Sequence, residues 1–167
     1  MAVCRIGFGT DRHRLGPGDG LRVGGVTVPA AQRALAHSDG DVLLHALTDA
    51  LLGAIAAGDI GTLFPDDREE NRDRDSADFV QAAWARVRDA GLVLGNLDMV
   101  VHLQQPRLSP HRPAIVARVA ELLDADPARV SFKAKSGEGV GPVGTGAVET
   151  PTLCHETYVE TTNHETS

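Results

Sequence analysis

The stretch DVLLHALTDALLGAIAA (41–57) decides how this chain folds. It is apolar almost all round, which predicts a helix that lies deep in the core rather than on the surface. The segment Ser38-Asp39-Gly40-Asp41 before it resembles a capping box, because a serine precedes an acid by three residues. Gly58 is typical of the residue at which such a helix ends. The rest of the chain is therefore expected to pack around this helix.

Strands and helices are mixed along the remainder of the sequence. Strands are predicted over 3–15, 97–103, 130–134 and 147–161, with 21–28 returning as a hairpin partner of the first strand. Helices are predicted over 76–90 and over 109–124, where Pro110 takes the favoured first position. Loops are expected over 59–75 and 137–146, and a frayed tail over 162–167. Such a mixture is typical of the α+β or α/β class.

Composition limits what the chain can do. With 167 residues it suits one domain, 1–167, and a hydrophobic fraction of 42% allows a real core. The formal net charge of −7 argues against a nucleic-acid partner, which needs a basic face. No signal peptide and no apolar run of about 20 residues is visible, so we expect a cytoplasmic protein with no membrane partner. A small anionic ligand stays possible, because a metal or a helix N-terminus can attract it.

Two groups of ionisable residues suggest a metal site. Asp11 and His13 lie two apart on a predicted strand and so point to the same side, although such a pair also occurs by chance on surfaces. Asp41, His45 and Asp49 are spaced four apart on the apolar helix and share one face. A lone histidine there would be a hydrogen-bonded core residue, but three buried ionisable groups must be paired or bind something.

Taken together, Asp11, His13 and His45 would give zinc three protein ligands and leave a fourth position open, as in catalytic sites. Asp49, one turn beyond His45, is expected to orient the imidazole. His37 and Ser38 precede the helix, where free backbone N–H groups attract anions, so a phosphate could meet both side chains. The plainer interpretation is that Ser38 caps the helix, and both roles can coexist.

Three longer motifs contain these residues: RIGFGTDRH (5–13), LAHSDGDVLLHALTDALLGA (35–54) followed by GDIGTLFPD (58–66), and QQPRLSPH (104–111). In this order they resemble the 2-C-methyl-D-erythritol 2,4-cyclodiphosphate synthase family over essentially the whole chain. The resemblance implies an α+β domain with a mixed β-sheet and helices packed on one face. It also implies a homotrimer with active sites between subunits, each holding zinc and a second divalent cation, Mg²⁺ or Mn²⁺.

The resemblance also implies a reaction of the non-mevalonate isoprenoid pathway. A cytidine diphosphate-linked substrate, 4-diphosphocytidyl-2-C-methyl-D-erythritol 2-phosphate, would be cyclised to the 2,4-cyclodiphosphate with release of CMP. Carried onto this sequence, it makes His37 and Ser136 catalytic, Asp11, His13 and His45 zinc ligands, and Glu138 the acid at the second metal. The implied substrate contacts are Ser38, Asp59, Ile60, Gly61, Phe64, Pro65, Asp66, Gln104, Gln105, Pro106, Arg107, Leu108, Ser109, Lys135 and Gly137.

The segment 133–145 departs from the family pattern. Lys135 and Gly137 flank Ser136 where the family has a run of threonines, and Pro142 and Thr145 replace an aromatic residue and an arginine. These changes leave open a divergent paralogue that cyclises a different cytidylyl phosphate. A non-catalytic metal-binding trimer and a metal-dependent phosphohydrolase are further alternatives. The intact ligand set argues against the first of these two, and the nucleotide motif argues against the second.

Overall fold

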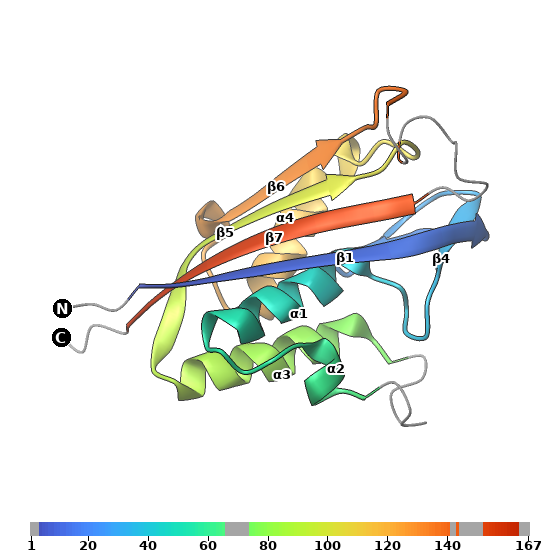
Figure 1. Ribbon diagram of the computed structural model, residues 1–167. Coiled ribbons are helices and arrows are strands. Elements are labelled where there is room, and N and C mark those ends of the chain that lie inside the picture. Colours follow the sequence, from blue (N-terminus) through green and yellow to red (C-terminus); the bar gives the residue numbers. More distant parts are fainter. Residues whose placement is uncertain (1–3, 66–73, 141–142, 144–151, 164–167) are drawn as a thin grey trace.

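The computed structural model describes residues 4–65, 74–140, 143 and 152–163, the last range for its backbone alone. A five-stranded sheet in the order β4-β1-β7-β5-β6 forms one layer, and the helices cover one of its faces (Figure 1). β5 and β6 run parallel, whereas the other neighbouring strands are antiparallel. The predicted α+β class, the mixed sheet and the placement of the helices are therefore confirmed.

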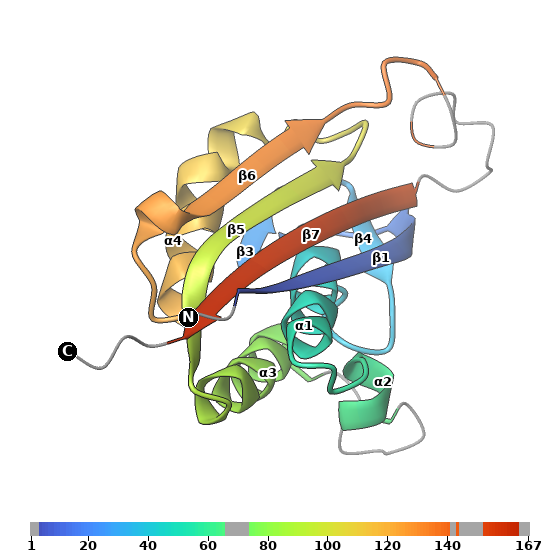
Figure 2. The same cartoon turned by 60° about the vertical axis from the view of Figure 1, so that its left-hand side comes forward.

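The sheet consists of β1 (Arg5–Pro17), β4 (Gln32–Leu35), β5 (Leu92–His102), β6 (Val130–Lys135) and β7 (Thr152–Asn163). A separate hairpin pairs β2 (Leu21–Val23) with β3 (Val26–Val28). The helices are α1 (Val42–Ala54), α2 (Ile60–Leu63), α3 (Ser76–Asp89) and α4 (Arg112–Leu122), with 3-10 turns at Ser109–His111 and Pro127–Arg129. Figure 2 shows α1, α3 and α4 on the same side of the sheet.

Several predicted boundaries are wrong. The segment 21–28 does not pair with the first strand, because Gly24 and Gly25 (φ 64° and 75°) turn it back on itself. The expected loop 59–75 contains α2, and β5 begins five residues before the predicted start at 97. β7 reaches Asn163, inside the predicted tail, while the predicted strand start at 147 lies outside the described residues.

The central helix differs from its prediction at both ends. Asp41, not Ser38, caps it, since the Asp41 side chain accepts the N–H of Leu44. The helix ends at Ala54 rather than at Gly58, and both Ala56 (φ 54°) and Gly58 (φ 86°) take a positive φ beyond its end. Eight of its apolar side chains are wholly buried, as predicted: Val42, Leu43, Leu44, Ala46, Leu47, Ala50, Leu51 and Leu52.

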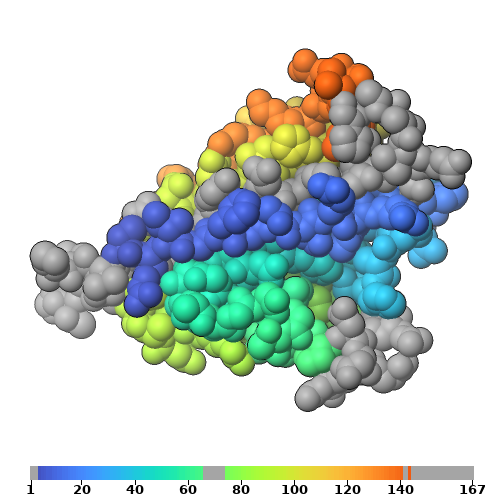
Figure 3. Space-filling view, in the orientation of Figure 1, coloured from blue at the N-terminus to red at the C-terminus, as the bar shows by residue number. Residues whose placement is uncertain are grey.

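Two glycines bring β1 and α1 into direct backbone contact. Gly7 and Gly9 are buried on the helix-facing side of β1. A Cβ at Gly7 would meet the carbonyl oxygen of Ala50 at 1.8 Å, and one at Gly9 would meet that of Ala46 at 2.0 Å. In the space-filling view of Figure 3, β1 lies along α1 over most of the helix. Since alternate strand residues share a face, Asp11 and His13 also point toward α1.

The opposite face of the sheet carries large exposed apolar side chains. Ile6 is 71% exposed and Phe8 is 51% exposed, and both alternate with the buried glycines of β1. Exposed apolar groups of this size next to one another mark a surface that a partner covers. Among the described residues, no helix is both long and apolar enough to cross a membrane.

Candidate functional site

Asp11 and His13 from β1 meet His45 from α1 at one point. His45 Nδ1 lies 3.0 Å from Asp11 Oδ2 and 3.2 Å from His13 Nε2. His13 Nε2 lies 3.2 Å from Asp11 Oδ2. Ligand atoms at about 2.0–2.1 Å from a tetrahedral zinc ion lie roughly 3.3 Å apart, so these three atoms fit a single ion of that size. In the part of the chain that the structure describes, these three residues form a candidate metal site.

The local electrostatics lower the pKa of Asp11 and of His13. Burial raises the pKa of Asp11, but the hydrogen bond from His45 and the neighbouring His13 outweigh it, so that the pKa falls below its ordinary value. Burial lowers the pKa of His13 by more than the Asp11 carboxylate raises it. A metal binds neutral imidazole and ionised carboxylate, so both shifts favour metal binding near neutral pH.

The triad lies at a cavity of about 320 Å³. Residues predicted to contact substrate also line it: His37, Ser38, Ile60, Gly61 and Phe64. His37 is exposed, which leaves its ring accessible to a ligand. Ser38 does not cap α1; its hydroxyl lies 2.9 Å from His45 Nε2 and accepts the N–H of Gly40 at 3.2 Å.

The start of α2 holds the next group of predicted substrate contacts. Asp59 caps α2 by accepting the N–H and the hydroxyl of Thr62, at 2.7 and 2.8 Å. These hydrogen bonds lower the pKa of Asp59. Pro65 is half-buried beyond the end of α2, and Asp66 lies outside the described residues.

The other two acids of the helical stripe have separate roles. Asp49 accepts the N–H of Ile60 at 2.8 Å and so fixes α2 to α1; burial raises its pKa. No hydrogen bond from Asp49 to His45 is seen among the described contacts, and the expected orienting role of Asp49 stays a prediction. Asp41 is wholly buried and accepts N–H groups from Gly24 at 2.9 Å and Gly25 at 2.6 Å, which fixes the β2–β3 hairpin to α1.

Two residues at this site escaped prediction, Asp39 and Ser76. The hydroxyl of Ser76 lies 2.9 Å from His45 Nε2 and donates to Asp39 Oδ1. Ser76 is wholly buried at the first residue of α3, 31 positions from His45 in sequence. No spacing rule links the two positions, so only the tertiary fold identifies the contact. Asp39 could have been suspected, because it lies inside the long motif 35–54.

A second cavity, of about 230 Å³, lies at the ends of β5 and β6. It is lined by Gln104, Gln105, Arg107, Leu108, Ser109, Lys135 and Ser136, which unites the predicted nucleotide loop with the predicted catalytic serine. Pro106 follows a cis peptide bond in that loop, and Gly137 N donates to Gln104 Oε1 at 3.0 Å. This cavity and the triad cavity share no lining residue.

A single chain therefore does not complete the predicted site. His37 and Ser136 line different cavities, so the predicted catalytic pair is not brought together within one chain. Glu138 is exposed in a left-handed conformation (φ 47°) and does not join the metal triad. Within one chain, the triad and Ser136 therefore belong to two separate cavities.

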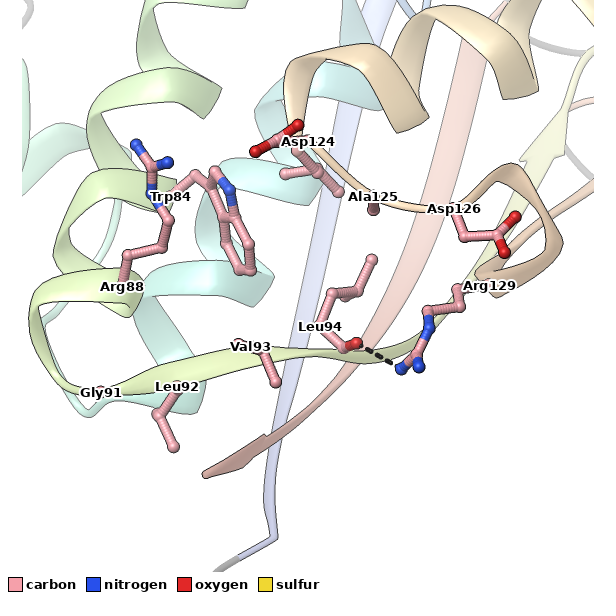
Figure 4. A pocket seen from close by; sticks show the side chains of 11 residues that line it. Trp84, Arg88, Gly91, Leu92, Val93, Leu94, Asp124, Ala125, Asp126 and Arg129 are labelled. Atoms are coloured by element: carbon pink, nitrogen blue, oxygen red, sulfur yellow. Dashed lines mark hydrogen bonds between the residues drawn. The ribbon is translucent and has the colours of Figure 1, made fainter. Parts of the chain in front are cut away.

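A third cavity, of about 420 Å³, lies where α3 ends and β5 begins (Figure 4). Trp84, Arg88 and Arg129 are among its lining residues, and none of the predicted site residues is. Arg129 Nη1 donates to Leu94 O at 2.8 Å, which fixes one wall of this cavity. The predicted chemistry lies elsewhere in the molecule.

Comparisons of the sequence and of the structure with known proteins match the same family over most of the chain. The model of the YgbB family matches residues 4–152. The 2-C-methyl-D-erythritol 2,4-cyclodiphosphate synthase of Rhodopirellula baltica is 55% identical over 140 residues, 84% of either chain. A solved structure of such a synthase has a TM-score of 0.83 at 40% identity and covers 93% of this chain and 98% of its own. A CDP-bound form has the same TM-score at 37% identity, with the same coverage of both chains.

Proposed function

Because the chain belongs to the YgbB family, we propose that it is a 2-C-methyl-D-erythritol 2,4-cyclodiphosphate synthase, a lyase of isoprenoid biosynthesis. The observation that carries this proposal is the convergence of Asp11, His13 and His45 within 3.2 Å of one another at a cavity. The substrate is 4-diphosphocytidyl-2-C-methyl-D-erythritol 2-phosphate, and the products are the 2,4-cyclodiphosphate and CMP.

The reaction needs positioning more than proton transfer. An oxygen of the 2-phosphate attacks the β-phosphorus, the bond from that phosphorus to the bridging oxygen breaks, and this oxygen leaves with CMP. The nucleophile is already an anion near neutral pH, so no strong general base is required. His37 and Ser38 line the cavity beside the triad, where they can hold phosphate oxygens in line. Asp11, His13 and His45 would hold zinc, which would supply Lewis-acid chemistry at the diphosphate.

The loop 104–109 binds the cytidine half of the substrate. Its cavity offers the amide groups of Gln104 and Gln105, the Ser109 hydroxyl and the Arg107 guanidinium, which suit a base edge and a phosphate. A structurally similar synthase has been solved in a CDP-bound form, which supports the binding of a cytidine nucleotide by this family. Lys135 lines the same cavity and adds a cation next to the diphosphate.

A homotrimer completes the active site. The two cavities share no residue, and the exposed Ile6 and Phe8 give the uncovered sheet face an apolar surface suited to a second copy of the chain. Such an assembly would bring Ser136 and Glu138 of one subunit to the triad of its neighbour. Glu138 would there hold the second divalent cation, Mg²⁺ or Mn²⁺. The absence of a membrane-spanning helix among the described residues fits a cytoplasmic enzyme.

Incubation of the purified protein with the substrate, zinc and Mg²⁺ or Mn²⁺ tests this function. We expect CMP and the cyclic diphosphate to form in equal amounts, and His45→Ala to abolish both. A folded, zinc-loaded protein that forms no cyclic product would contradict the proposal. In that event a paralogue that uses another cytidylyl phosphate would be favoured.

A further inference from the structure

We propose that Ser76 and Asp39 are positioning residues that hold the imidazole of His45 with Nδ1 directed at the metal; this inference rests on the metal centre of the proposed function. Metal-bound histidines commonly donate their second ring N–H to a nearby acceptor, which fixes the orientation and tautomer of the ring. Here the acceptor is the buried hydroxyl of Ser76, which the half-buried carboxylate of Asp39 in turn holds in place.

The tautomer follows from counting protons. The carboxylate of Asp39 can only accept, so the hydrogen bond between Ser76 Oγ and Asp39 Oδ1 uses the single proton of the serine hydroxyl. Ser76 Oγ then has only lone pairs to offer His45 Nε2, 2.9 Å away, and Nε2 must carry the ring proton. When a metal ion takes the place of the proton that Nδ1 shares with Asp11, the one N–H left on the neutral ring is the one on Nε2, which Ser76 Oγ accepts.

Asp39 is itself fixed from several sides. Its Oδ1 accepts the N–H of Asp41 at 3.2 Å, and its Oδ2 accepts the N–H of Ser76 at 3.3 Å. The Nε of Arg22 lies 3.8 Å from Oδ2, within ion-pair distance. Ser76 is wholly buried, so its hydroxyl has no access to bulk water as an alternative partner.

Ser38 cannot replace this arrangement. Its hydroxyl also lies 2.9 Å from His45 Nε2, but it accepts the N–H of Gly40 and lines the cavity in which we place phosphate. Among the contacts of the described residues, no carboxylate orients the Ser38 proton. The Ser38 hydroxyl therefore stays able to rotate toward a ligand, while the Ser76–Asp39 pair keeps the ring fixed.

Zinc affinity of the full-length protein tests the proposal, measured by competition with a fluorescent chelator. We expect Ser76→Ala and Asp39→Asn each to weaken zinc binding by at least about tenfold. The double variant should bind no more weakly than the weaker single variant, because Asp39 acts through Ser76. Thr48→Val is the matched control, because it also removes a wholly buried hydroxyl. This hydroxyl lies on α1, donates to Leu44 O and does not contact His45. Its zinc affinity should stay within about twofold of the wild type.

The ring protons give a second measurement that does not depend on the variants folding. In a long-range ¹H–¹⁵N spectrum of the zinc-loaded wild-type protein, the proton of the His45 ring should lie on Nε2. A proton on Nδ1 in that form, or wild-type zinc affinity in Ser76→Ala, would overturn the proposal. A wild-type chain that binds no zinc would refute the metal centre itself, whereas normal zinc binding with no loss in either variant would refute only the role of Ser76 and Asp39.

Discussion

Replacing Gly9 by alanine should separate β1 from α1 and damage the fold and the metal site together. The new Cβ would lie 2.0 Å from the Ala46 carbonyl oxygen, and an ordinary contact needs about 3.4 Å. The helix must therefore retreat by roughly 1.4 Å, because the obstructing atom is backbone and cannot rotate away. We expect a loss of about 3 kcal/mol in the free energy of unfolding, or about 6–12 °C in Tm for a chain of this length.

The same displacement should weaken metal binding. Asp11 lies two residues beyond Gly9, and His45 precedes Ala46, so both ligands are close to the point of strain. The present 3.0 Å between His45 Nδ1 and Asp11 Oδ2 would grow toward about 4.4 Å, beyond the roughly 3.3 Å that zinc ligands span. Calorimetry would give the Tm, and competition with a chelator would give the zinc affinity, which should fall at least about tenfold.

Gly53→Ala is the control, because it introduces the same methyl group into α1 without the clash. Its Cβ would lie 3.7 Å from the Phe8 carbonyl oxygen, an ordinary contact. Removing a glycine from a helix should stabilise the protein by about 0.5–1 kcal/mol. If Gly9→Ala matched this control in Tm and zinc affinity, the close packing of β1 on α1 would not be what positions the ligands.

Three further outcomes are expected. Asp41→Ala removes the acceptor for the N–H groups of Gly24, Gly25 and Leu44 and should lower the free energy of unfolding in urea by about 3–5 kcal/mol. A loss below about 1 kcal/mol would show that the hairpin does not depend on Asp41. Ile6→Lys places a charge on the apolar sheet face, so sedimentation should show monomers that bind as much zinc per chain as the wild type. Intact trimers would show that the interface between subunits lies elsewhere. Removing zinc with a chelator should lower Tm by about 8–16 °C if the metal is present at about a thousand times its Kd, while a chelator-insensitive Tm would argue against a metal that binds only the folded state. His45→Ala should show no such drop.

Most of the metal site could be predicted from local periodicity. Asp11 and His13 are two apart on a strand, so they share a face wherever that strand lies. His45 lies on a helix too apolar to be anywhere but the core, and the strand that carries the other ligands packs directly on it. To predict this triad it was enough to know which face of its strand or helix each residue occupies. The strand period of two residues and the helix period of 3.6 residues give that face.

The failures arise where a partner comes from a distant segment. Asp49 Oδ1 accepts the N–H of Ile60 at the start of α2, a short helix in a segment that was expected to be a loop. Ser76 reaches His45 only because α3 begins beside the 38–41 loop. The wrong prediction for 21–28 has another cause. Here the sequence does contain the turn signal, the pair Gly24-Gly25, so the hairpin could have been predicted.

The nucleotide half of the site shows a further limit. Gln104 to Ser109 and Ser136 are brought together as expected, because β5 and β6 are neighbouring parallel strands that end at the same edge. In the proposed trimer, their relation to the triad would depend on contacts between copies of the chain. The sequence patterns identify both groups of residues but contain no signal for such contacts.

An anomalous difference map at the zinc edge, from crystals grown with zinc and CDP, tests the central claim most directly. We predict one peak about 2.0–2.2 Å from Asp11 Oδ2, His13 Nε2 and His45 Nδ1, with CDP held by the 104–109 loop of a neighbouring subunit. Zinc bound through His45 Nε2, or bound away from these three residues, would contradict the account.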